Sequence, residues 1–176
     1  SAVNGHARPL ANRHRKSFNW LHGSPMLSVV NAKLLIVLHL LGACIWTGGH
    51  LVLALAVLPR ALQDRSPDVI REFESGFERL GIPALLVQVL TGVLLTSRFF
   101  PDLRRLLAFD SPVATYVVAK LGLLLLTVML ALHARLRIIP TLSRETLPKL
   151  AWHIRAVTLT AVLFVVFGAG IHFGGW

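Results

Sequence analysis

The sequence predicts an all-α integral membrane protein with four transmembrane helices in an up-and-down bundle. Hydrophobic residues make up 55% of the 176 residues, and the mean hydropathy is +0.67. Four long stretches are almost free of charge, and each approaches the ~20 residues that a helix needs to cross the hydrocarbon core. The eight acidic residues all lie outside these stretches. Because lipid cannot satisfy backbone hydrogen bonds, stretches of this kind must be helical.

We divide the chain into a basic polar tail, residues 1–31, and a four-helix bundle, residues 32–176. The tail contains His6, His14 and His22, but its composition is typical of a solvated segment rather than a metal site. Pro59 is expected to end the first helix. The fourth helix is expected to begin near Pro148, because proline is well tolerated in a first turn. The spans are predicted at about 32–58, 80–98, 112–135 and 151–174.

The connection before the second span has a helical pattern of its own. Ile70, Phe73 and Phe77 recur at helical spacing among charged residues. This pattern predicts a short amphipathic helix lying on the membrane surface. The net charge of +10 belongs to the loops and the tail, where it suits anionic lipid headgroups, and we expect a bilayer rather than nucleic acid as partner.

Two histidines of the first span, His39 and His50, lie on one helical stripe with Trp46. They are separated by almost three full turns, roughly 16 Å along the axis, so they belong to two different levels of the bundle. The level of His39 also holds Lys120 and His172. An ammonium within a span is costly unless it has a partner, so Lys120 is a functional candidate.

The level of His50 holds three further candidates, Met129, His133 and His153. Met129 and His133 are four residues apart, and therefore share one face of the third helix. Imidazole and thioether groups suit cuprous ion. The alternative for each histidine is a hydrogen-bonded packing role, and Met129 alone is typical of core filler.

The sequence offers no support for hydrolytic chemistry. It contains no Ser-His-Asp pattern, no Cys-x-x-Cys pair and no carboxylate pair within a span, and its glycines form no phosphate loop. We therefore assign no catalytic residue, and a role other than that of an enzyme is favoured. The glycines within the spans are interpreted as positions where helices approach closely.

Three stretches resemble the CopD family of copper-resistance membrane proteins. They are LLIVLHLLGACIWTGGHLVLALAVLPRAL, LLVQVLTGVLL and VVAKLGLLLLTVMLALHARLRIIPTL. The resemblance implies a bacterial inner-membrane protein that handles copper, and it points to His39, Trp46, His50 and Lys120. Longer members of the family have about eight spans and are implicated in moving copper. A chain with four spans resembles the short, stand-alone forms of the family, for which a homo-oligomer or a larger membrane complex could supply the remaining spans.

The same features are similar, more loosely, to the HemJ-type protoporphyrinogen oxidases, which are linked to b-type haem. Two main hypotheses follow. In the first, the protein binds copper through His50, Met129, His133 and His153. In the second, it binds haem b at the level of His39, Lys120 and His172, or between His50 and His133. A third alternative is an accessory subunit whose histidines are structural.

Overall fold

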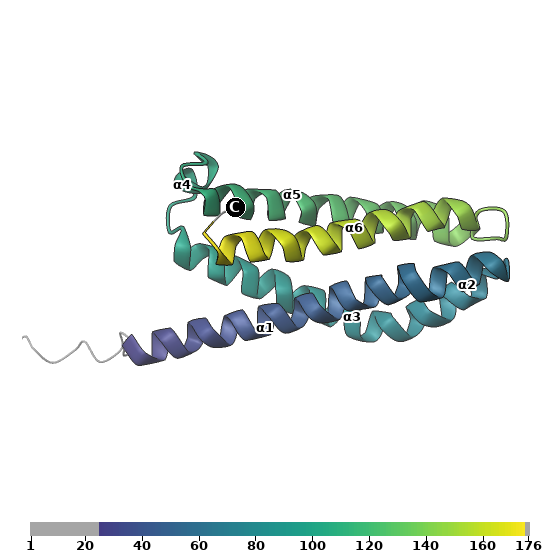
Figure 1. Cartoon of the computed structure of the whole chain (residues 1–176), viewed down its shortest axis with the longest axis horizontal. Coiled ribbons are helices and arrows are strands. Elements are labelled where there is room, and N and C mark those ends of the chain that lie inside the picture. The colour runs from purple at the N-terminus through teal and green to yellow at the C-terminus, as the bar shows by residue number, and fades with distance from the viewer. Residues whose placement is uncertain (1–24, 175–176) are drawn as a thin grey trace, which may run out of the picture.

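The computed structural model describes residues 25–174, and its helices are shown in Figure 1. Within that range the chain contains helices and no strand. Four helices are long and apolar enough to cross a membrane, namely Asn31–Gln63, Pro67–Phe99, Pro112–Thr141 and Leu147–His172. The predicted all-α membrane fold is therefore confirmed. The three tail histidines lie outside the described residues.

The first membrane helix is continuous past Pro59, which was expected to end it. It consists of α1 (Pro25–Val52), a π-helical turn η1 (Leu53–Val57) and α2 (Leu58–Gln63). The ring of a helical proline clashes with the carbonyl four residues earlier, here that of Leu55, and proline lacks the N–H to bond it. The wide turn is centred on Leu55 and makes room for the ring. The helix also begins at Pro25, within the segment predicted to be tail.

The second membrane helix, α3 (Pro67–Phe99), is one uninterrupted helix. The prediction of a separate surface helix around Ile70 and Phe77 is therefore wrong. The helical spacing of these residues continues directly into the apolar segment, and Pro83 is accommodated inside the helix. The boundary between charged and apolar sequence is thus a change of environment along one helix.

The second half of the chain forms a helical hairpin. After α4 (Leu103–Leu107), α5 (Pro112–His133) begins with the side chain of Ser111 accepting a hydrogen bond from the Ala114 N–H. A second π-helical turn, η2 (Ala134–Ile138), and a 3₁₀ turn, η3 (Ile139–Thr141), follow. The π-helical turn η2 is centred on Leu136, four residues before Pro140. It makes room for the proline ring in the same way as η1 does in the first helix. Helix α6 (Leu147–His172) starts with Pro148 in its first turn, as predicted.

The helices pack as two antiparallel pairs. Helix α1 lies along α3, α5 lies along α6, and the two pairs meet through α1 and α6 (Figure 1). We call the end that carries α2 and residues 139–146 the loop end, and the end that carries α4 and the end of α6 the terminal end. The tightest hydrophobic core lies at the loop end and contains Leu58, Ile70, Leu147 and Leu150.

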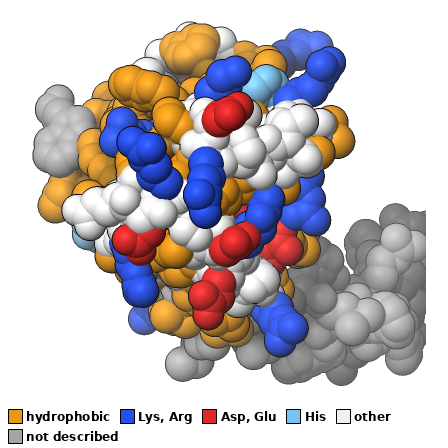
Figure 2. Space-filling view, turned by 90° about the vertical axis from the view of Figure 1, so that its right-hand side faces the viewer, with side chains coloured by type: hydrophobic (Ala, Val, Ile, Leu, Met, Phe, Trp, Pro, Cys, Tyr) orange, Lys and Arg blue, Asp and Glu red, His pale blue; other side chains and the backbone are white. Residues whose placement is uncertain are grey.

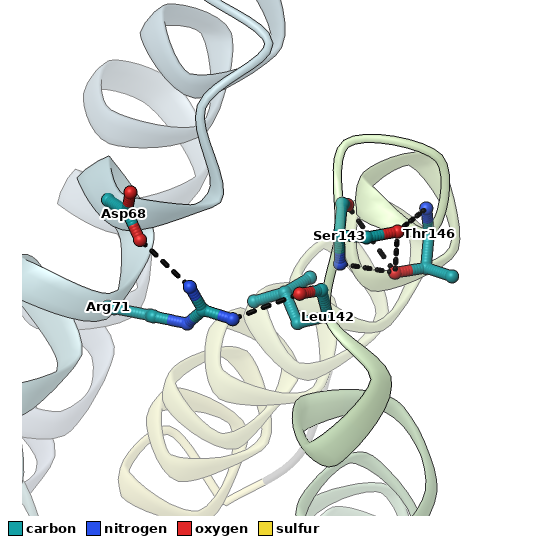
Figure 3. A network of polar contacts seen from close by, with 5 residues as sticks. All are labelled: Asp68, Arg71, Leu142, Ser143 and Thr146. Carbon is teal, nitrogen blue, oxygen red and sulfur yellow. Dashed lines mark hydrogen bonds and ion pairs between the residues drawn. The ribbon is translucent and has the colours of Figure 1, made fainter.

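Polar contacts also hold the loop end together. Arg71 of α3 donates to Asp68 and, at 2.9 Å, to the carbonyl of Leu142, while Ser143 and Thr146 bond each other before α6 (Figure 3). The outer face of this end is rich in Lys and Arg side chains, with fewer acidic ones between them (Figure 2). Such a face favours the cytoplasmic side of a membrane, and this orientation remains a prediction.

Threonines join the two helix pairs inside the span. Thr158 of α6 donates to the carbonyl of His50 at 3.1 Å, and Thr47 of α1 donates to the carbonyl of Ala161 at 3.3 Å. Hydrogen bonds of this kind are typical connections between membrane helices. They fix α1 against α6 at the level of His50.

Candidate functional site

His39 of α1 is held against α3 in one defined tautomer. Its Nδ1–H donates to the carbonyl of Gln88 at 2.9 Å and lies 3.0 Å from the hydroxyl of Thr91. The Nδ1–H donor leaves Nε2 as a lone-pair acceptor. Gly92 makes room for the ring, because a Cβ at that position would lie 3.1 Å from Cε1 of His39.

Lys120 of α5 and His39 belong to the same level, as their depths predict, and they interact electrostatically. The ammonium Nζ of Lys120 lies beside α6, 3.4 Å from the place where a Cβ would stand on Gly168. His172, the third residue predicted for this level, is exposed and contacts Phe173 edge-on with the ring centroids 5.6 Å apart. His39 and Lys120 therefore share a level by depth and electrostatic influence, with His39 held against α3 and Lys120 beside α6, while His172 lies in a separate contact.

His50 lies in an aromatic cluster between α1 and α3. Its Nδ1–H donates to the carbonyl of Trp46 at 2.8 Å, and the two rings lie 4.4 Å apart. Phe77 of α3 meets His50 edge-on at 5.7 Å and stacks on Phe73 at the same distance. A Cβ on Gly49 would lie less than 3.0 Å from the Phe77 ring, so this glycine is required for the close approach.

Two buried polar atoms lie between the two levels without a hydrogen-bond partner in the described part of the chain. They are the indole Nε1 of Trp46 and the amide Oε1 of Gln88, whose residue is 9% exposed. Buried polar groups are normally paired, so each such atom in a native fold calls for an explanation. The α1–α3 interface therefore contains polar groups all the way from His39 to His50. Gly42 lets the two helices approach closely beside Gln88, because a Cβ on Gly42 would lie 3.2 Å from the Cβ of Gln88.

At the loop end, His133 of α5 and His153 of α6 form a direct pair. His133 Nδ1 lies 2.8 Å from His153 Nε2, and the ring planes are inclined by only 15°. The Nδ1–H of His153 donates to the carbonyl of Lys149 at 3.3 Å. His153 Nε2 is therefore the acceptor, and His133 Nδ1–H is the donor. The π-helical turn η2 begins at the residue after His133, and such turns are frequent at functional sites.

The four residues predicted as copper ligands are divided in the structure. His133 and His153 are in contact, whereas the His50 ring contacts Trp46 and Phe77. Met129, one helical turn before His133, is 60% exposed. Among residues 25–174, no three His, Cys, Asp or Glu side chains gather closely enough to hold one metal ion.

Several residues that shape these centres were not singled out as site residues from the sequence. Thr91 and Phe77 hold the two imidazoles, and Gly92, Gly49 and Gly168 leave the space beside the functional side chains. Phe77 lies in the helical pattern of α3, which could have indicated that it faces α1. The glycines were recognised only as positions of close packing.

The fold and these centres define a four-helix integral membrane protein. One histidine lies at each of two depths inside the bundle, and a pair of histidines lies at the loop end. Residues 71–171 match the family model described as copper resistance protein D (CopD), which covers more than half of the chain. The chain therefore belongs to the CopD family. No curated protein and no solved structure matches it. The matched part runs from α3 to α6 and includes Lys120, Met129, His133 and His153.

Proposed function

We propose that this protein binds cuprous ion at its loop end, through His133 and His153, and so handles copper at the membrane surface. Membership of the copper resistance family supports copper as the ion. The observation that carries the site is the contact of two imidazole nitrogens, 2.8 Å apart, from two different helices. On the family resemblance we also propose the bacterial inner membrane as its location.

The hydrogen bond between the two rings indicates what happens when an ion binds. Imidazole binds metal through a nitrogen lone pair, so the proton on His133 Nδ1 must move to Nε2 of the same ring if Nδ1 is to bind the ion. Metal–imidazole bonds are about 2.0 Å long, which requires the two nitrogens to move apart to about 3.3–4 Å. The rings lie at the ends of α5 and α6, and both can move by side-chain rotation alone. Copper binding at these two nitrogens therefore requires a change of tautomer at His133 and no net release of a proton.

The surroundings of the pair suit a soft monovalent cation. Met129 lies on the same face of α5, one turn away, and its thioether is a soft donor that favours cuprous ion. Arg135 is the nearest cation in sequence to His133, but it forms an ion pair with Glu78. Its charge is thereby offset. We propose Met129 as the third ligand.

His50 was predicted to share this site, but in the structure it lies inside the bundle. We therefore propose that copper binding at the loop end does not depend on His50. The His50 ring keeps its Nε2 lone pair because Nδ1–H donates to the Trp46 carbonyl. It remains a candidate for a second, inner position.

The test is cuprous ion binding to the purified protein under reducing conditions, measured by competition with a cuprous chelator. We expect His153→Ala to lower the affinity at least about tenfold, as losses of metal-site groups generally do. His172→Ala is the matched control, because it removes an exposed histidine near the other end of α6. Unchanged affinity in His153→Ala would contradict the proposal. Equal loss in His50→Ala would instead support the larger site predicted from the sequence.

A further inference from the structure

Lys120 places an amine within the third membrane helix, and no carboxylate of residues 25–174 pairs with it. Four ion pairs occur among residues 25–174, and none includes Lys120; they are Arg60–Asp64, Arg71–Asp68, Arg105–Asp110 and Arg135–Glu78. Helix α5 contains no acidic residue. A charged side chain within a span is costly, and it generally finds a counter-charge, a carbonyl or water. The charge of Lys120 therefore calls for a partner that the described chain does not supply as a carboxylate.

The ammonium lies directly beside Gly168 of α6. Nζ is 3.4 Å from the position of a Cβ on Gly168, so an alanine there would touch the ammonium at ordinary contact distance and a larger side chain would crowd it. Tyr116, one turn before Lys120, contacts Phe167 with ring centroids 5.9 Å apart. Nζ therefore lies where α5 meets α6, and Tyr116 and Phe167, which neighbour Lys120 and Gly168 along their helices, also meet there.

His39 adds a hydrogen-bond acceptor to this level and cannot neutralise the charge. Its Nδ1–H is occupied by the Gln88 carbonyl, so Nε2 presents a lone pair. The ring and Lys120 interact electrostatically. Together they offer one cation and one acceptor, which complement an anion that also carries a hydroxyl group.

We propose that Lys120 and His39 form a binding site for one anionic head group, a phosphate or a carboxylate, carried by a membrane amphiphile. Lys120 lies two turns, about 12 Å, from the start of α5, which places it toward the terminal end of the span. The residues next to it on the outer side of α5 face lipid, with Leu121 48% and Leu125 63% exposed. An acyl chain can lie along these leucines while the head group reaches Nζ. The site differs from the copper site in place and in ligand chemistry.

Retention of phosphatidylglycerol tests this assignment, since that lipid carries both a phosphate and hydroxyl groups. The protein is reconstituted with phosphatidylcholine and phosphatidylglycerol, washed in neutral detergent, and analysed by native mass spectrometry. We expect one phosphatidylglycerol to remain on the unmodified protein. Lys120→Met should lower its retention at least about fivefold, and Lys149→Met, which removes an exposed lysine at the loop end, should not.

Two further arms keep the result decisive. Gly168→Val leaves the charge in place but fills the space beside Nζ, and it should also lose the lipid, so the assignment remains testable if Lys120→Met does not fold. Inorganic phosphate added during the wash distinguishes a free anion from a lipid. If a low concentration of phosphate displaces the lipid, the site binds free phosphate, and the proposal of an amphiphile is refuted. Equal retention by Lys120→Met and Lys149→Met would overturn the proposal. Cuprous ion binding should be unchanged in both, so the two proposals fail separately.

Discussion

Gly49 allows a direct test of the packing that positions His50. In the structure, a Cβ at this position would lie less than 3.0 Å from three carbons of the Phe77 ring, whereas ordinary contacts begin at 3.4 Å. The ring cannot move away freely, because it stacks on Phe73 and meets His50 edge-on. Gly49→Ala must therefore push α1 and α3 apart or displace the imidazole.

The expected magnitude follows from two opposing effects. Overpacking of a well-packed contact costs about 1–3 kcal/mol. Replacing a helical glycine by alanine gains up to about 1 kcal/mol in helix propensity. Gly48→Ala isolates the gain, because a Cβ on Gly48 meets no atom within 4 Å. The two variants should thus differ by about 1–3 kcal/mol, with Gly49→Ala the less stable.

The assay is equilibrium unfolding in mixed micelles by titration with a denaturing detergent, followed by tryptophan fluorescence. Adding Phe77→Ala to each glycine variant completes a double-mutant cycle, which isolates the interaction between the ring and the new methyl group. The penalty of Gly49→Ala should disappear when the ring is absent. Equal stability of Gly48→Ala and Gly49→Ala with the Phe77 ring in place would refute the proposed packing.

Two further predictions concern the packing of the bundle and the choice between the copper and haem hypotheses. Thr158→Val removes the hydroxyl that donates to the His50 carbonyl, and it should lower the free energy of unfolding by about 0.6 kcal/mol in the same assay. Thr115→Val is the control and should lower it less, because the Thr115 hydroxyl bonds to the Ser111 carbonyl at the start of its own helix. A visible spectrum separates the copper and haem hypotheses. We expect no Soret band from the purified protein, and a band that disappears in His39→Ala would instead support haem b at the level of Lys120.

The sequence predicts the helices and their depths well, because both depend on local properties. Apolar length identifies the four helices, and the rise per residue is enough to group His39 with Lys120 and His133 with His153. The direct contact of His133 with His153 follows from depth together with the antiparallel order of the helices, whereas the common level of His39 and Lys120 stays a prediction from depth.

Rotation about each helix axis is what the sequence leaves undetermined. Depth along the sequence groups His50 with His133, yet the His50 ring is directed to Trp46 and Phe77 because α1 packs along α3. That choice depends on which helices are neighbours, and on glycines such as Gly49 that permit the approach. The continuity of α3 is hidden for a related reason, since a change from charged to apolar sequence is typical of a helix boundary but here marks a change of environment along one helix.

The positions of the centres favour a protein that holds copper over one that conducts it in this conformation. The hydrophobic core at the loop end, which includes Leu53 and Ile154, surrounds the part of the bundle beyond His50. An ion bound at His133 and His153, as proposed, would have to pass apolar side chains of this core to reach His50. At the other end of the bundle, the ammonium of Lys120 repels a cation unless an anion is bound beside it. Passage of copper would require the hydrophobic core to open and the charge of Lys120 to be compensated. A second copy of the chain or a larger complex, as proposed from the family resemblance, could supply both changes.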